Sequence, residues 1–215
     1  NVDDAEKQKA LAFKVNFKSV KILAKKAFIN KIPLIHFSTD YVFDGKKKKS
    51  YIENDTPKPL NTYGKSKLAG ENAIREVDGQ YYIFRTSWVY SNRKKNFYLT
   101  IKKLIKEQKK LRIVSDQFGV PTSNAFIAQQ IMKIIPLINN KNKGLYHLVP
   151  NGNCSWYQFS KKIIKHDGQN FNIKNLHQTK SKFFESIAKR PKNSVLSNEK
   201  VKKTFNLEFK SWYKT

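Results

Sequence analysis

The chain has 215 residues, of which 39% are hydrophobic and 13% aromatic. This composition is typical of a folded protein with one domain, or one domain and a small lobe, and excludes a disordered chain. No stretch of apolar residues is long enough for a membrane-spanning helix. The single cysteine, Cys154, excludes an internal disulfide and favours a reducing, cytoplasmic compartment.

The net charge of +27 raises the question of nucleic-acid binding. Base recognition and bidentate phosphate recognition favour arginine, but almost all of the basic residues here are lysines. These lysines are spread along the whole chain and do not form one patch. We therefore expect no specific nucleic-acid partner.

Hydrophobic periodicity predicts helices that alternate with short strands. The expected elements in chain order are a helix over 6–28, a strand over 32–37, a helix over 62–77, a strand over 81–86, a helix over 96–108, a strand over 111–114, a helix over 125–138, a strand over 145–149 and a helix over 155–165. The remainder has a mixed pattern. In the first helix, we expect Leu11, Val15, Ile22 and Leu23 to face inward.

Strands that alternate with helices are typical of an α/β fold with a doubly wound, Rossmann-like parallel sheet. Ligands of such sheets bind beyond the carboxyl ends of the strands. Thr39 and the Ser87–Trp88 pair follow two predicted strands, and Tyr63 follows the first of them. We therefore expect these side chains to lie at one edge of the sheet.

Tyr63 and Lys67 lie four residues apart, so on a helix they share one face. A lysine ammonium can lower the pKa of a phenol and make it a usable proton donor. Spacing alone is weak support, because the chain contains four such pairs: Tyr63/Lys67, Tyr90/Lys94, Tyr98/Lys102 and Tyr157/Lys161. Only the first follows a Pro-Leu-Asn turn.

Several stretches around this pair point to a known family. They are Val2-Asp3 with Ala5-Glu6, then residues 38–45 (STDYVFDG), 59–71 (PLNTYGKSKLAGE), 85–90 (RTSWVY) and 116–122 (DQFGVPT), and last Arg190-Pro191 with Asn193-Ser194 and Leu196. In these motifs, over nearly its whole length, the chain resembles the extended short-chain dehydrogenase/reductases, and among them the dTDP-4-dehydrorhamnose reductase family.

The resemblance implies NADPH- or NADH-dependent reduction of the 4-keto group of dTDP-4-dehydro-L-rhamnose to dTDP-L-rhamnose. Tyr63 would be the general acid, Lys67 would orient the nicotinamide ribose, and Thr39 would assist at the carbonyl. Residues 1–115 would be the remainder of the NAD(P)-binding domain. Residues 116–215 would mostly form a small mixed substrate-binding lobe, with a return strand and helix near residues 125–150 on the main sheet.

The resemblance also implies further contacts with both ligands. The residues expected to bind cofactor are Tyr63, Lys67, Phe37, Ser38 and Ser87. Those expected to bind the nucleotide sugar are Thr39, Asp40, Trp88, Gln117, Pro121, Thr122 and Arg190, the last as a partner of the diphosphate. We expect no metal site and no membrane partner, and a homodimer is one possible assembly.

Some of these residues also have a purely structural interpretation. Arg190 could form a surface ion pair, Trp88 could pack in the core or at an interface, and Asp40 could bond its own loop. His36 and His147 lie inside apolar strands, and we expect both to be core histidines.

Two other functions fit part of the pattern. One is a different nucleotide-sugar reductase or epimerase of the same extended family. The other is a non-catalytic regulatory subunit of methionine adenosyltransferase, which uses a similar scaffold. The joint presence of Tyr63, Lys67 and Thr39 argues against the second.

The eight glycines form no Gly-rich turn of the kind that binds a dinucleotide pyrophosphate. We therefore expect the sequence to be a piece of a longer protein whose Gly-rich cofactor segment precedes Asn1. Residues 1–215 alone are then expected neither to bind NADPH usefully nor to reduce a 4-keto sugar.

Overall fold

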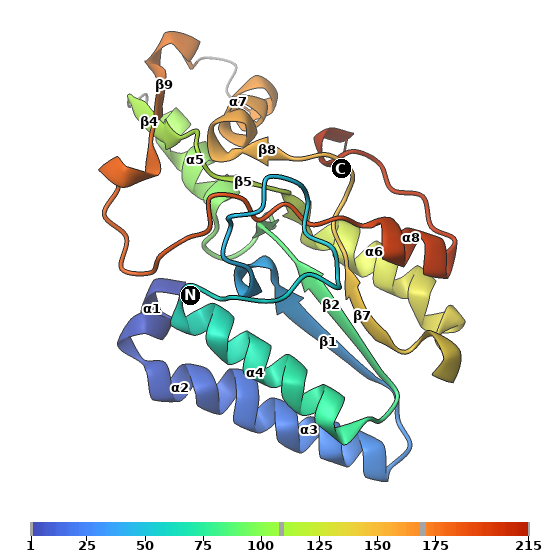
Figure 1. Ribbon diagram of the computed structural model, residues 1–215. Helices are drawn as coiled ribbons and strands as arrows, with labels where there is room; N and C mark the ends of the chain where they lie inside the picture. Colours follow the sequence, from blue (N-terminus) through green and yellow to red (C-terminus); the bar gives the residue numbers. More distant parts are fainter. Residues whose placement is uncertain (1, 108–109, 168–170, 215) are drawn as a thin grey trace.

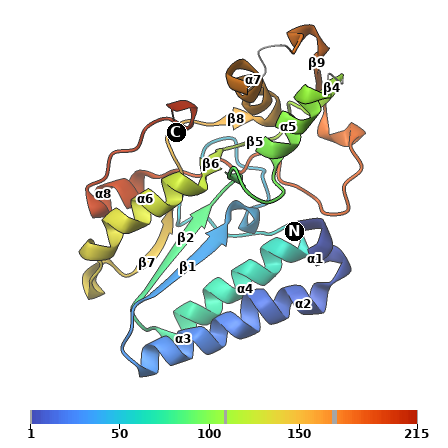
Figure 2. The ribbon, with the colours of Figure 1, turned by 180° about the vertical axis from the view of Figure 1, so that it is seen from behind.

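The centre of the molecule is a parallel sheet of three strands. The computed structural model describes residues 2–107, 110–167 and 171–214. The strand order is β1-β2-β7, with β1 at Leu34–Thr39, β2 at Tyr81–Thr86 and β7 at Gly144–His147. Figures 1 and 2 show helices on both faces of this sheet. The doubly wound α/β architecture predicted from the sequence is thereby confirmed.

One face of the sheet is covered by the N-terminal helices and α4. This layer contains α1 (Val2–Lys7), α2 (Lys9–Phe13), a π-helical turn (Lys14–Lys18), α3 (Ser19–Ile29) and α4 (Thr62–Val77). Val20 and Ala24 of α3 and Ile74 of α4 pack on Ile83 of β2. Burial of this apolar cluster anchors α4 beneath the strands.

The opposite face is covered by α6 (Asn124–Ile134) and α8 (Glu199–Phe205) (Figure 1). Successive side chains of a strand point to opposite faces, so Tyr82 and Phe84 of β2 lie on this side and Ile83 on the other. The two aromatic residues form a core with Phe126 of α6 and Phe205 of α8. Both faces of the central strand are therefore covered, as the apolar run Tyr81–Phe84 at its start requires.

A smaller lobe lies above the carboxyl ends of the strands (Figures 1 and 2). It contains α5 (Phe97–Lys106), α7 (Trp156–Asp167) and a parallel strand pair, β4 (Leu111–Val114) with β9 (Leu176–Thr179). These four elements share one hydrophobic cluster. The predicted domain boundary at residue 115 stays a prediction. We propose from this packing that the lobe also includes residues 97–107 and 110–115.

Short strand pairs join the lobe to the sheet. β3 (Val89–Tyr90) pairs with β6 (Thr122–Ser123), and β5 (Phe118–Gly119) pairs with β8 (Cys154–Ser155). Short 3-10 helices cover Asp40–Val42, Ile135–Leu137, Asn140–Asn142, Ile173–Asn175, Ser181–Phe183 and Trp212–Lys214. Within the described ranges, no helix is long and apolar enough to cross a membrane.

Most predicted elements form where the periodicity places them. α4 and β2 have the predicted bounds. β1 begins two residues later than predicted, because its pairing with β2 starts at Leu34 and leaves out Ile32 and Pro33. The helix predicted over 96–108 is α5, and residue 108 lies outside the described residues. The strand predicted over 111–114 forms, but it pairs with β9 in the lobe.

The prediction for the inward face of the first helix is wrong. Leu11, Val15, Ile22 and Leu23 are all more than half exposed. The buried residues of α3 are instead Val20 and Ala24, and the π-helical turn at residues 14–18 interrupts the 3.6-residue period between α2 and α3. The π-helical turn packs tightly on α4. A Cβ on Gly70 of α4 would lie only 2.2 Å from the Asn16 carbonyl oxygen of this turn.

Candidate active site

The amino end of α4 is fixed against the carboxyl end of β1. Asn61 caps the helix by accepting a hydrogen bond from the Gly64 amide at 2.8 Å. The Glu6 carboxylate accepts from both the amide and the hydroxyl of Thr62. A Cβ at Gly64 would lie 2.1 Å from the Tyr41 carbonyl oxygen, so only glycine allows this close approach. These contacts determine where the next side chain, Tyr63, lies.

Tyr63 lies beside Thr39 and Asp40, as the sequence predicts. Its ring packs edge-on against Tyr41, with 6.1 Å between centroids. Burial and the nearby Asp40 carboxylate raise the pKa of Tyr63, and a hydrogen bond with Thr39 lowers it in part. The phenol therefore stays protonated at neutral pH, which suits a proton donor.

The groups that shift the pKa of Tyr63 in this structure are the buried surroundings, Asp40 and Thr39, so the expected electrostatic support from Lys67 stays a prediction. The Lys67 ammonium instead donates to the Phe37 carbonyl oxygen of β1 at 2.6 Å and lies 3.3 Å from His36 Nε2. Burial lowers the pKa of Lys67, whereas the Glu71 carboxylate raises it. A long lysine side chain can leave its helix neighbour and bind a strand, so the shared helix face does not settle its partner.

Asp40 is a buried carboxyl group next to the candidate proton donor. Its Oδ1 accepts from the Thr39 hydroxyl at 3.1 Å. Oδ2 is buried without a hydrogen bond of ordinary geometry, although the Ser194 hydroxyl lies close enough to affect the group. Burial raises the pKa of Asp40 to about 6, against the opposing effect of the Ser194 and Thr39 hydroxyls.

The raised pKa of Asp40 predicts a pH-dependent stability. Between its ordinary pKa and about 6, the folded chain holds a proton that the unfolded chain has lost, so the free energy of unfolding falls as pH rises through this window. Asp40→Asn removes the buried charge and should raise the free energy of unfolding at pH ~7.5 by up to about 3 kcal/mol. At pH ~4 the two proteins should have nearly equal free energies of unfolding.

Urea titrations at both pH values measure this difference in stability. A gain that is the same at both pH values would contradict the raised pKa of Asp40. Asp4→Asn, at an exposed position, is the matched control.

A buried ion network holds α4 to β1 and β2. Glu71 is fully buried and accepts from Arg85 Nε at 2.9 Å and from Arg85 Nη2 at 2.6 Å. The Ser38 hydroxyl and Arg75 complete its shell. Burial raises the pKa of Glu71, but the Arg85 guanidinium outweighs it and holds this pKa below the ordinary value. The network fixes the helix turn that follows Lys67.

Besides Thr39 and Asp40, four more of the predicted contact residues are buried. The Ser38 hydroxyl is used by Glu71, while the Ser87 and Thr122 hydroxyls both donate to the Val120 carbonyl oxygen. Pro121 is also buried. Their predicted ligand contacts stay predictions, and the side-chain bonds show that these residues also shape the sheet edge.

Trp88 follows β2 in an unusual backbone conformation, with φ of +45°. Its indole stacks on Trp156 of α7, with 3.5 Å between centroids, and covers Gly119. A Cβ at Gly119 would lie 2.4 Å from this ring, so glycine is needed there. Trp88 thus joins the sheet edge to the lobe, and a role in substrate binding stays a prediction.

Arg190 is partly buried and paired with an acidic side chain. Its Nη2 donates to Asp3 Oδ2 at 2.7 Å, and the Ala188 amide donates to the other oxygen of the same carboxylate. Burial lowers the pKa of Arg190, but its bonds with Asp3 and Tyr41 outweigh burial and raise it. Arg190 therefore does form an ion pair, partly buried and with a partner from α1, and its contact with the diphosphate stays a prediction.

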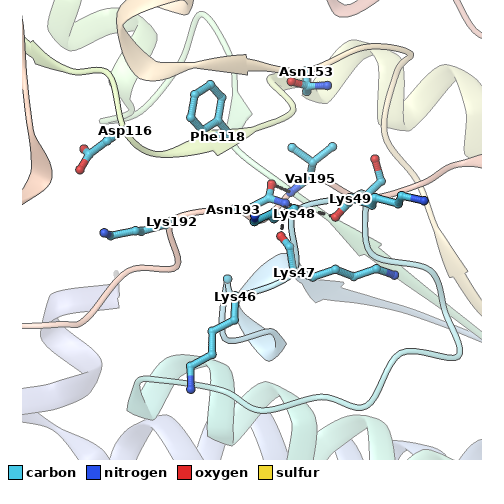
Figure 3. A pocket seen from close by; sticks show the side chains of 12 residues that line it. Lys46, Lys47, Lys48, Lys49, Asp116, Phe118, Asn153, Lys192, Asn193 and Val195 are labelled. Carbon is cyan, nitrogen blue, oxygen red and sulfur yellow. Dashed lines mark hydrogen bonds between the residues drawn. The ribbon is translucent and has the colours of Figure 1, made fainter.

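A basic cleft opens between the sheet edge and the lobe. One part, of about 690 Å³, lies between the loop around Lys46–Lys49 and the segment Lys192–Val195 (Figure 3). A second part, of about 840 Å³, shares Lys46 and Lys192 with the first and extends to Gln117 and Arg190. Gln117 and Arg190, two of the residues predicted to bind the nucleotide sugar, therefore line one cleft. Its other charged lining residues are Asp44, Asp116, Lys180, Lys182 and Lys189.

Comparison with known proteins identifies the family. The model of the RmlD substrate binding domain matches residues 1–215. The dTDP-4-dehydrorhamnose reductase of Escherichia coli K12 is 38% identical over 98% of this chain and 72% of its own length. The chain belongs to the dTDP-4-dehydrorhamnose reductase family.

Solved structures agree with this assignment. A reductase of this family from Bacillus anthracis, in complex with NADP, has a TM-score of 0.92 at 34% identity and covers 100% of this chain and 74% of its own. One from Clostridium acetobutylicum has a TM-score of 0.92 at 37% identity, over 99% and 74% of the two chains. The resemblance inferred from the motifs is confirmed.

Within this reductase family fold, the other tyrosine–lysine pairs lie elsewhere. Tyr98 and Lys102 of α5 do contact each other at 3.4 Å, but both also bind Asp167 of α7 in the lobe. Tyr157 and Lys161 lie in α7. Context therefore distinguishes Tyr63 and Lys67 from equally spaced pairs with local roles.

Three partners of the site in this reductase family member were not predicted from the sequence. His36, predicted to be a core histidine, is only partly buried and faces Lys67. Glu6 and Asp3, in the matching motif at the start of the chain, bind the α4 terminus and Arg190. The motif marked the latter two residues as relevant, but no spacing rule indicates contacts across such sequence distances. His147 is fully buried, as predicted.

Proposed function

We propose that this protein reduces the 4-keto group of dTDP-4-dehydro-L-rhamnose with NADPH or NADH and so makes dTDP-L-rhamnose. Membership of the reductase family supports the reaction class. The observation that carries the proposal for this chain is the meeting of Tyr63, Thr39 and Lys67 at the carboxyl end of β1. This is where ligands of parallel α/β sheets bind.

In the proposed mechanism Tyr63 donates its proton to the carbonyl oxygen. Its raised pKa keeps the proton on the phenol until negative charge develops on that oxygen. Thr39 lies within hydrogen-bonding reach of the phenol, and its hydroxyl can donate to the same oxygen when its proton turns from Asp40 Oδ1 to the substrate. The nicotinamide cofactor supplies the hydride when bound. Asp40 disfavours an early loss of the phenol proton, because its carboxylate raises the pKa of Tyr63.

The residues present fit a nicotinamide ribose next to Lys67. An ammonium has three N–H donors and no acceptor. In the described part of the protein two of these donors are directed to Phe37 and His36, which leaves one for a ribose hydroxyl. We propose that Lys67 contacts the ribose. Phe37 and Ser38, near the carboxyl end of β1, would lie beside it.

The basic cleft fits the diphosphate of a nucleotide sugar. Lys46, Lys189 and Lys192 line it beside Gln117, and a diphosphate carries negative charge that such a surface attracts. Arg190 reaches both this cleft and Tyr41, the ring neighbour of Tyr63. We propose that the cleft leads the sugar to Tyr63.

Replacing Lys67 tests the cofactor assignment. Lys67→Met keeps an unbranched side chain of nearly the same length but removes its donors, so NADPH should bind about tenfold or more weakly to the full-length enzyme. Calorimetric titration measures this affinity. Lys102→Met, in the equally spaced pair of α5, should bind NADPH as the wild type does. Equal affinities for all three proteins would reject Lys67 as a cofactor contact.

Two further assignments belong to the proposal. We propose a cytoplasmic location, supported by the buried, unpaired thiol of Cys154. We also propose a homodimer, supported by the apolar side chains that α2 and α3 expose, among them Leu11 and Ile22. Light scattering of the full-length protein would measure the mass, and a monomer at all concentrations would reject the dimer.

A further inference from the structure

His36 lies on the face of β1 that looks toward α4. Strand side chains alternate, so Leu34, His36 and Ser38 share this face. Leu34 packs with Ile74 of α4 and Ser38 bonds Glu71, while His36 meets Lys67 between them. A histidine in this row therefore contacts the one lysine that the proposed mechanism needs.

The contact requires a neutral imidazole with a free lone pair on Nε2. An ammonium can only donate, so at 3.3 Å Nε2 must accept and the ring proton must lie on Nδ1. Burial, and then the Lys67 ammonium, lower the pKa of His36 to about 4, whereas Glu71 raises it. His36 is thus neutral throughout the neutral range.

The charged groups around His36 make this arrangement specific. Lys67 and Glu71 of α4 are the titratable groups that influence it, and its register partner on β2 is the apolar Ile83. The Phe37 carbonyl fixes one N–H of Lys67 and His36 fixes a second. Two acceptors at adjacent positions of one rigid strand restrict the ammonium far more than one would.

We propose that His36 is a positioning residue, whose Nε2 holds the Lys67 ammonium so that its remaining N–H is presented to the cofactor ribose. This inference rests on the proposed function of Lys67. It predicts that loss of the acceptor weakens cofactor binding while the proton donor Tyr63 is unaffected. The Michaelis constant for NADPH should therefore rise while the turnover number at saturation stays near that of the wild type.

Substitutions at position 36 of the full-length enzyme test the proposal. His36→Leu removes the acceptor, so the dissociation constant for NADPH at neutral pH should rise about tenfold. His36→Gln supplies an amide oxygen and should restore most of the affinity. His177→Leu, at an exposed position of β9, controls for loss of a histidine and should change nothing. Tight binding by His36→Leu would overturn the proposal.

A second measurement does not depend on cofactor or activity. The pKa of His36, followed by NMR, should rise in Lys67→Met because the neighbouring positive charge is gone. An unchanged pKa would show that the two side chains do not interact, and would overturn the proposal even if His36→Leu failed to fold.

The two hypotheses can be separated by comparing the variants. If Lys67→Met binds NADPH weakly but His36→Leu binds it normally, His36 does not position Lys67 and the proposed function stands. If Lys67→Met itself binds normally, the cofactor role of Lys67 fails, and with it this inference.

Discussion

Tyr63→Phe should lower the turnover number of the full-length enzyme by ~100-fold or more, because general acid catalysis contributes ~100- to 10,000-fold. The phenylalanine ring keeps the edge-on contact with Tyr41, so folding and the Michaelis constant for the nucleotide sugar should change little. Steady-state kinetics with NADPH measure both constants. Because burial and Asp40 raise the pKa of Tyr63, wild-type activity should also persist well into the alkaline range.

Tyr98→Phe is the matched control for this prediction. Tyr98 has the same lysine spacing and contacts its lysine directly, but it lies in the lobe and binds Asp167. Its replacement should leave turnover near the wild-type value. If Tyr63→Phe and Tyr98→Phe had the same small effect, Tyr63 would not be the proton donor.

Glu71→Gln should have the largest effect on stability. The change leaves the guanidinium of Arg85, which is 1% exposed, without its opposite charge. Breaking a buried ion pair on one side typically costs about 3–5 kcal/mol. Because glutamine still accepts one hydrogen bond, we expect a loss of about 3 kcal/mol in the free energy of unfolding. Urea titration at neutral pH measures it.

The double variant Glu71→Leu/Arg85→Met controls for the ion pair itself. It replaces both charges with apolar groups, which is often close to neutral for a buried pair. Most of the lost stability should therefore return, since Arg75 is partly exposed and can be solvated. The single variants Glu71→Leu and Arg85→Met complete the comparison. If the double variant lost as much stability as these two together, packing and not charge pairing would account for the loss.

Local signals predicted the elements that carry the site. Helix α4 has its predicted bounds because Asn61 caps its start and Asp78 ends it in a left-handed conformation. Strand β2 begins with an apolar run, Tyr81–Phe84, and is almost wholly buried, which is a strong pattern in a parallel sheet. The place of Tyr63 and Thr39 at one sheet edge followed from these two elements and the topology.

The contacts made by long side chains could not be predicted in this way. Arg190 bonds Asp3 across almost the whole chain, and Lys67 bonds Phe37 on a neighbouring strand. No helix or strand period relates such positions. The inward face of the first helix failed for a different reason, because the π-helical turn at residues 14–18 breaks the period from which the prediction was extrapolated.

The product of the full-length enzyme tests the central claim most directly. Incubation with dTDP-4-dehydro-L-rhamnose and NADPH should give dTDP-L-rhamnose, identified by NMR, with an equimolar loss of NADPH. Tyr63→Phe should slow both changes together. Formation of an epimerised 4-keto sugar without consumption of NADPH, or no turnover by a folded protein that binds both ligands, would contradict the account.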